Sequence, residues 1–124
     1  MNFNNISIGC DIEKISRFEN KIDDVQFLQK LYTENEIEYC KGKSAPARHL
    51  AARYCAKEAV IKALTAFKIR DVFYKDIEVR NEASGMPNVR IVKNGYNKVE
   101  IKISISHSDD TAFATVIAQN IHDN

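Results

Sequence analysis

The chain has 124 residues, of which 44% are hydrophobic and 28% are charged, and its formal net charge is +1. This length predicts one domain (residues 1–124), small enough that association with further copies would help to bury apolar surface. The near-neutral charge argues against nucleic acid as a partner, and there is neither an apolar run of the ~20 residues that a membrane helix needs nor a signal peptide. Three cysteines without metal-ligand spacing suggest reduced thiols, so we expect a cytoplasmic protein.

The first part of the chain is expected to form one strand and then helices. Ile6–Cys10 alternates apolar with small or polar residues, which is typical of a half-buried strand. A short helix or turn is expected at Glu13–Phe18, and Phe27–Tyr32 has apolar residues at helical spacing. Thr33 and Glu36 have the spacing of a capping box, so a helix should begin at Thr33. That box explains the Thr-x-x-Glu pattern without a catalytic role.

After a basic loop at Lys41–Pro46, one long helix is expected from Ala47 to about Phe67, because this stretch is rich in Ala, Leu, Lys and Glu and lacks Gly. The helix is apolar nearly all round, which predicts burial on most sides. At roughly 100° per residue, the polar residues of the helix fall on two lines along its surface. One line consists of His49, Arg53 and Lys57, and the other of Glu58, Lys62 and Thr65. The second line fits either an ordinary ion pair or a site that holds a cation beside a phosphate.

The rest of the chain reads as strands and turns. The expected strands are Asp76–Arg80, Val89–Val92, Val99–Ser106 and Ala112–Ala118. Turns are expected at Ser84–Pro87, at Asn94-Gly95 (as a hairpin between the second and third of these strands) and at Asp109-Asp110. Asn120–Asn124 should be a frayed tail. The sequence therefore predicts an α+β fold, with a small antiparallel sheet packed against the long helix.

Polar residues end two of these strands. Asp11 directly follows the first strand, and Ser106-His107-Ser108 closes the Val99–Ser106 strand. Taken alone, both are ordinary turn chemistry. Ser106 beside His107 invites a hydrolase interpretation, but the glycines of a nucleophile elbow are absent. His49 lies on the basic line of the helix and could approach a ligand bound there, but it is expected to be an ordinary solvated helix histidine. His122 lies in the expected tail.

Five motifs occur in order between Ile6 and about Ala118. They are Gly9-Cys10-Asp11 with Arg17, Thr33-Glu34-Asn35-Glu36, the helix segment from Cys55 to Ala63, Gly85-Met86-Pro87, and Ser106-His107-Ser108. In this order and spacing they resemble the holo-acyl-carrier-protein synthase family, the small-subunit class of 4'-phosphopantetheinyl transferases. The chain departs from the family pattern at Cys10, Tyr54 and Cys55, which lie beside the functional positions.

The resemblance implies an enzyme of fatty acid biosynthesis. It would transfer the 4'-phosphopantetheine group of coenzyme A to a serine of apo-acyl-carrier protein and release adenosine 3',5'-bisphosphate. The family's pattern implies Mg²⁺, a cation that prefers oxygen ligands, bound by Asp11 and Glu58. Lys62 would contact the diphosphate, and Ser106 and His107 a phosphate. The serine proton would go either to Glu58 or to a metal-bound water oriented by Asp11.

The same resemblance assigns binding roles and an assembly. Arg53 would bind the ribose 3'-phosphate, Gly85 and Pro87 would flank the adenine, and Arg17 would dock the carrier protein. The small-subunit class is trimeric, which implies a homotrimer whose sites combine Asp11, Glu58 and Lys62 of one subunit with His107 and the Gly85–Pro87 turn of the next. The apolar side chains of Ile101, Ile103 and Ile105 suggest surface that a neighbour covers.

Two alternatives remain open from the sequence. A paralogue that modifies polyketide or peptide-synthetase carrier domains would look the same. The other alternative is a non-catalytic domain that binds a carrier protein or coenzyme A. The presence of Asp11, Glu58, Lys62 and His107 together argues against it, because a domain that only binds has no need of a pair of metal ligands.

Overall fold

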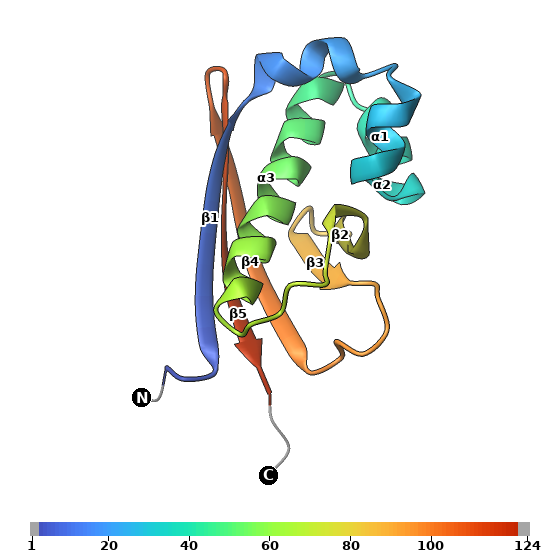
Figure 1. Ribbon diagram of the computed structural model, residues 1–124. Helices are drawn as coiled ribbons and strands as arrows, with labels where there is room; N and C mark the ends of the chain where they lie inside the picture. The colour runs from blue at the N-terminus through green and yellow to red at the C-terminus, as the bar shows by residue number, and fades with distance from the viewer. Residues whose placement is uncertain (1–2, 122–124) are drawn as a thin grey trace.

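A three-stranded antiparallel sheet is the base on which the molecule is built. The computed structural model describes residues 3–121. Its main sheet has the order β1-β5-β4, with β1 at Ile6–Lys14, β4 at Val99–Ser108 and β5 at Thr111–Asn120 (Figure 1). The expected turn at Asp109-Asp110 joins β4 directly to β5, so that Ser108 pairs with Thr111. Asp109 takes the left-handed conformation there, with φ at 50°.

The helix α3 (Pro46–Thr65) lies across one face of β1 and β5, as Figure 1 shows. Small residues make this close approach possible, because Ala112, Ala114 and Ala118 of β5 are buried beneath the helix. Gly9 of β1 is more tightly constrained. A Cβ on Gly9 would lie 2.0 Å from the carbonyl oxygen of Ala59, so any side chain at this position would push α3 off the strand.

Between β1 and α3 the chain forms η1 (Ile15–Lys21), α1 (Val25–Leu31) and α2 (Glu34–Lys41). The helix expected to begin at Thr33 is confirmed as α2. The Thr33 hydroxyl accepts from the Glu36 N–H, and the Glu36 carboxylate accepts from the Thr33 N–H, which is a complete capping box. The expected basic loop is shorter than Lys41–Pro46, because Lys41 ends α2 and Pro46 already begins α3.

A second, two-stranded sheet follows η2 (Tyr74–Asp76) and pairs β2 (Ile77–Asn81) with β3 (Pro87–Ile91). The turn between them is the expected one, and Gly85 adopts a φ of +90° in it. The hairpin expected around Asn94-Gly95 is wrong. Gly95 does turn the chain, with a φ of +97°, but β4 pairs over its whole length with β5, leaving residues 92–98 as a loop between the two sheets.

The α+β class is therefore confirmed, with two small antiparallel sheets in place of one. The part of the expected tail that can be described is ordered, because the Asn120 N–H donates to the Asn5 carbonyl at 2.9 Å. Residues 122–124, including His122, lie outside the described residues. Within residues 3–121, no helix has the length and apolar character needed to cross a membrane.

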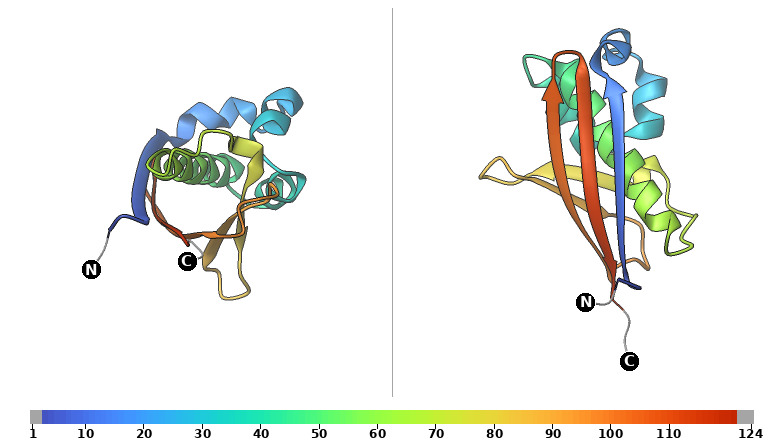
Figure 2. Two further views of the ribbon diagram at one scale, coloured as in Figure 1. Left: turned by 60° about the horizontal axis from the view of Figure 1, so that its bottom comes forward. Right: turned by 90° about the vertical axis from the view of Figure 1, so that its left-hand side faces the viewer.

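No helix of residues 3–121 covers the face of the main sheet turned away from α3, as Figure 2 (right) shows. Apolar side chains are exposed on this face. Ile8 is 75% exposed, Ile12 63%, Phe113 38% and Ile117 55%. Register brings them together in two rows, since Ile8 pairs with Ile117 and Ile12 with Phe113. We call these four residues the outer apolar face. Ile101, Ile103 and Ile105, which were expected to form such a surface, instead lie half-buried against the core.

Candidate active site

The first cluster of candidate residues lies where α3 crosses β1. Gly9 lets the helix approach at Ala59 and Ala63, and the side chain two residues further along the same face of the strand, Asp11, contacts Lys62 of the same helix. The Lys62 ammonium lies 3.2 Å from Asp11 Oδ1 and 3.0 Å from the carbonyl oxygen of Cys10. Asp11 was expected to follow the first strand directly, but β1 continues to Lys14, so Asp11 lies within the strand, paired with Ala114. Asp11 and the helix lysine singled out by the sequence are nevertheless brought together.

Glu58 lies one helical turn before Lys62 and joins the same cluster. Its Oε1 accepts a hydrogen bond of 2.6 Å from the hydroxyl of Tyr74, a residue that sequence analysis missed. Glu13 was missed as well. Its pKa is raised, first by burial, then by a hydrogen bond to Asp11 and the Asp11 charge, with a smaller contribution from Glu58. Three carboxylates therefore lie close enough to influence one another.

The donor set of this cluster fits a hard divalent cation. Asp11 Oδ2 is a buried oxygen without a hydrogen-bond partner in the described part of the chain, and burying an unpaired carboxylate oxygen is costly. Residues 3–121 contain no group of three or more His, Cys, Asp or Glu side chains arranged to hold a metal by themselves. Two carboxylates alone suit Mg²⁺, which is commonly held by one or two carboxylates together with substrate phosphates and water.

A second cluster lines a pocket on the other side of α3, centred on Arg53. The residues around this pocket are Tyr39, Arg48, His49, Ala52, Arg53, Asn81, Gly85, Pro87, Ile105 and His107. Arg53 is 3% exposed, its Nη2 donates to Asn81 Oδ1 at 2.8 Å, and its guanidinium lies 4.2 Å from the centre of the Tyr39 ring. Arg53 Nε is buried without a partner among the described residues, which leaves a donor for a ligand.

The charges around this pocket favour an anion. The pKa of His49 is lowered, first by burial and then by the positive charges of Arg53, Arg48 and Lys43, with a further contribution from His107. His49 is half-buried, with its ring edge-on to Tyr39 at 5.7 Å, so the expectation that it is solvated was wrong. The surrounding positive potential suits a phosphate group.

The two clusters face in opposite directions from α3. Arg53 and Lys62 are nine residues apart, which at about 100° per residue is half a turn of the helix. His107, Gly85 and Pro87 lie with Arg53, and Asp11 and Glu58 lie with Lys62. A single chain therefore does not bring all the expected site residues together.

Of two further expected residues, Ser106 lies apart from both clusters and Arg17 lies at the edge of the carboxylate cluster. Ser106 neighbours His107 in sequence, but successive strand residues point to opposite faces, so Ser106 lies on the exposed side of β4, paired with Phe113. Arg17 is exposed on η1, as expected, and its guanidinium lies 3.3 Å from Glu13 Oε1.

Beneath the helix, Lys57 and Glu36 form an ion pair of 2.7 Å with both side chains fully buried. Lys57 Nζ also donates to the carbonyl oxygens of Tyr74 and Ile77, and Glu36 Oε2 accepts from the Val79 N–H. Burial lowers the pKa of Lys57, and the Glu36 charge opposes that effect. The sequence pattern accounts for Glu36 as a helix cap alone. The signal for the pair was the placement of Lys57 among the apolar residues of the helix.

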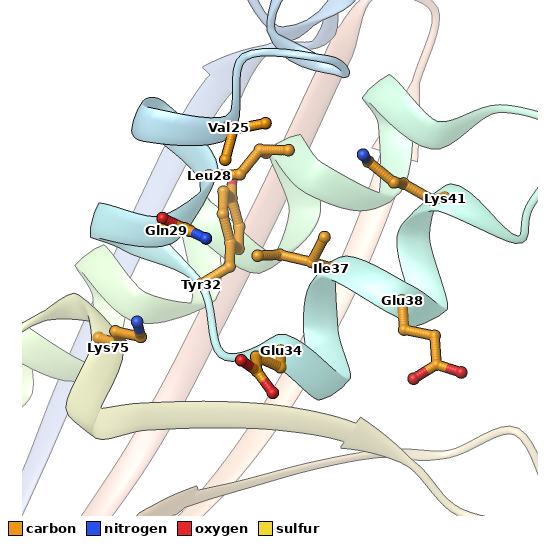
Figure 3. A pocket seen from close by; sticks show the side chains of 9 residues that line it. All are labelled: Val25, Leu28, Gln29, Tyr32, Glu34, Ile37, Glu38, Lys41 and Lys75. Carbon is orange, nitrogen blue, oxygen red and sulfur yellow. The ribbon is translucent and has the colours of Figure 1, made fainter.

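A groove between α1 and α2, shown in Figure 3, lies outside both clusters. Its lining residues are Val25, Leu28, Gln29, Tyr32, Glu34, Ile37, Glu38, Lys41 and Lys75. None of the candidate site residues is among them.

Comparison with known proteins decides the family. The sequence model of the 4'-phosphopantetheinyl transferase superfamily matches residues 7–117, and a curated holo-[acyl-carrier-protein] synthase of Thermodesulfovibrio yellowstonii is 45% identical over 113 residues, which are 89% of this chain and 95% of that protein. The chain belongs to the holo-acyl-carrier-protein synthase family.

Solved structures of holo-acyl-carrier-protein synthases share the fold. The Bacillus anthracis enzyme, solved in complex with CoA (3',5'-ADP), superposes with a TM-score of 0.77 at 34% identity, covering 93% of this chain and 96% of that one. The Helicobacter pylori enzyme, solved in complex with coenzyme A, has a TM-score of 0.76 at 28% identity, covering 90% and 99%. The family assignment made from the five motifs is confirmed.

Proposed function

We propose that this chain transfers the 4'-phosphopantetheine group of coenzyme A to a serine of apo-acyl-carrier protein in fatty acid biosynthesis. The observation that carries the proposal is the meeting of Asp11, Glu58 and Lys62 at the crossing of β1 and α3, where one carboxylate oxygen is buried and unpaired. The family membership of the chain supports the same reaction.

In this reaction the serine hydroxyl attacks the phosphorus that bears the pantetheine arm, and adenosine 3',5'-bisphosphate leaves. Asp11 and Glu58 would hold Mg²⁺, which when bound neutralises charge on the diphosphate. The Lys62 ammonium, already beside Asp11, would contact the diphosphate and stabilise the charge that develops on the leaving oxygen. Glu58, or a water oriented by Asp11, would take the serine proton.

The nucleotide end of coenzyme A would occupy the positive pocket. Arg53 has an unpaired buried donor for the 3'-phosphate, His107 would add a second contact, and Gly85 and Pro87, which line the same pocket, would flank the adenine. Ser106 faces away from this pocket, so it would contact a phosphate only if a neighbouring subunit carried that phosphate.

We further propose that the working unit is a homotrimer with its sites between subunits. The outer apolar face supports this assembly, since exposed apolar side chains in two paired rows are typical of association surfaces. The opposite directions of the two clusters support it as well. Lys62 and Arg53 of one chain lie on opposite sides of α3, so one ligand contacts both residue types more easily if Lys62 comes from one chain and Arg53 from the next. Arg17, exposed next to the carboxylate cluster, would dock the acidic carrier protein.

The test is to incubate the protein with apo-acyl-carrier protein, coenzyme A and Mg²⁺ and to follow the carrier by mass spectrometry. The proposal predicts the gain of one phosphopantetheine group, which is lost when the carrier's acceptor serine is replaced by alanine. Binding of coenzyme A without any mass gain would instead favour a non-catalytic binding domain. Faster modification of a polyketide or peptide-synthetase carrier domain would favour the paralogue alternative.

A further inference from the structure

The Glu58 carboxylate is fixed by a residue that lies outside all five motifs. The Tyr74 hydroxyl donates to Glu58 Oε1 at 2.6 Å, and the Tyr74 ring stacks on that of Tyr54 with centroids 5.6 Å apart and planes inclined by 14°. A stacked ring has little freedom to turn, so the hydroxyl is held at one place. We propose that Tyr74 is a positioning residue that orients Glu58 for cation binding, an inference that rests on the proposed role of Glu58.

The position of Tyr74 is set by the buried ion pair. Lys57 Nζ donates to the Tyr74 carbonyl at 2.7 Å, and Lys57 is itself held 2.7 Å from Glu36 Oε1. Glu36 belongs to α2 and Lys57 to α3, so the pair ties both helices to the segment that carries Tyr74. The Thr-x-x-Glu motif would thus contribute to the site indirectly, through Lys57 and Tyr74, in addition to capping α2.

The hydrogen bond has a specific consequence for a carboxylate ligand. A carboxylate has two oxygens and about four lone-pair directions, and the hydrogen bond to Oε1 takes up one of them and fixes the orientation of the group, while the remaining directions, including those of Oε2, stay open to a cation. Without the hydroxyl, the side chain would sample more rotamers, and each binding event would have to order it again. Removal of an outer partner of a metal ligand typically weakens metal binding about 10–100-fold.

The variant Tyr74→Phe isolates this hydrogen bond, because phenylalanine keeps the stack on Tyr54 and loses only the hydroxyl. Tyr96→Phe is the matched control. The Tyr96 hydroxyl also donates to a carboxylate, that of Asp71, but away from the cluster. Both variants should show wild-type thermal unfolding within a few degrees, which establishes that the fold is intact.

Binding of Mn²⁺, measured without substrates by loss of the free-ion electron paramagnetic resonance signal, is the direct readout. We expect the dissociation constant to rise about 10-fold in Tyr74→Phe and to stay unchanged in Tyr96→Phe. In the transfer assay, the Mg²⁺ concentration for half-maximal rate should rise by a similar factor in Tyr74→Phe. The KM for coenzyme A should remain as in the wild type, and saturating Mg²⁺ should restore most of the rate.

A third variant separates failure of this inference from failure of the proposed function. If Glu58→Gln loses Mn²⁺ binding while Tyr74→Phe binds Mn²⁺ as tightly as the wild type, Glu58 is a ligand and Tyr74 does not position it, so the inference is overturned alone. If Glu58→Gln binds Mn²⁺ and transfers phosphopantetheine like the wild type, Glu58 is not a metal ligand, so its proposed role and this inference are overturned together while the proposed transfer reaction stands. Absence of any mass gain on the carrier with the wild-type chain would overturn the proposed transfer reaction instead.

Discussion

The two lysines of α3 that lie five residues apart, Lys57 and Lys62, have opposite surroundings. Lys57 is fully buried, and its ammonium is satisfied by Glu36 and two backbone carbonyls. The Lys62 side chain is 54% exposed, and its partner Asp11 retains a buried oxygen without a partner in the described chain. Two lysines of one helix motif therefore differ in role. Lys57 stabilises the fold, whereas Lys62 and its partner Asp11 keep hydrogen-bonding groups available for a ligand.

The largest expected effect on stability comes from breaking the buried pair. Lys57→Met leaves the Glu36 carboxylate buried and uncompensated, so the free energy of unfolding should fall by about 3–5 kcal/mol. Lys62→Met, which removes an exposed charge, should change it by less than about 1 kcal/mol. Urea denaturation followed by circular dichroism measures both. Equal losses of unfolding free energy in the two variants would show that the Lys57–Glu36 pair stabilises the fold no more than the Lys62–Asp11 pair does.

Substitutions in the cluster of Asp11, Glu58 and Lys62 should show the reverse pattern, with a large loss of activity and little loss of stability. Glu58→Gln keeps the size of the side chain but lowers its affinity for Mg²⁺, so transfer should fall on the order of 10²–10³-fold or more. Asp11→Ala should act similarly. Thermal unfolding should stay close to that of the wild type. Near wild-type transfer by Glu58→Gln, or full activity in excess EDTA, would remove Glu58 from the metal site.

Within the substrate-binding residues, Lys62 and Arg53 should differ in which kinetic parameter they change. Lys62→Ala should mainly lower kcat, because the developing charge loses its partner. Arg53→Ala should mainly raise the KM for coenzyme A, by about 10–100-fold for one lost charged hydrogen bond. Dephospho-coenzyme A, which lacks the 3'-phosphate, supplies the control. If Arg53→Ala weakens both ligands equally, Arg53 does not bind the 3'-phosphate.

The smallest expected effect concerns docking of the carrier protein rather than the chemical step. Arg17 is exposed and pairs only with Glu13 at 3.3 Å in the described structure, so Arg17→Glu should leave kcat and coenzyme A binding nearly unchanged. The KM for the acidic carrier protein should rise several-fold, and the wild-type KM should rise with ionic strength. A carrier KM that is independent of salt would point to apolar docking instead.

Much of the fold was predictable because its signals are local. The capping box at Thr33, the two-residue turn at Asp109-Asp110 and the turn at Gly85 depend on residues a few positions apart, and each is present. The hairpin at Asn94-Gly95 failed because a turn signal does not specify partners. The strand after this turn, β4, pairs instead with β5, which follows β4 through the tighter turn at Asp109-Asp110.

The candidate site was predictable only where helical periodicity could reveal it. Arg53 and Lys62, which lie on different polar lines of α3, do face two different environments, whereas Lys57, on the same line as Arg53, is buried in the ion pair with Glu36. Tyr74 and Asn81 were missed because each joins its cluster through a contact between distant segments; Tyr74 is 16 residues from Glu58 in sequence, and Asn81 is 28 residues from Arg53. No local pattern encodes such contacts, which arise from the packing of η2 and β2 against α3. Glu13 was missed because the first strand was expected to end at Cys10, whereas β1 continues to Lys14 and places Glu13 on the same face as Asp11.

The central claim, that the two sides of α3 serve one site contributed by two chains, can be tested by mixing two inactive variants. Glu58→Gln and His107→Ala chains would be refolded together, and mixed assemblies confirmed by native mass spectrometry. If each site takes Glu58 from one subunit and His107 from the next, about a quarter of the sites in a random mixture pair two intact halves, and a corresponding part of the wild-type transfer rate should return. No recovery in confirmed mixed trimers would show that each site lies within one chain, and a monomer in sedimentation would contradict the assembly itself.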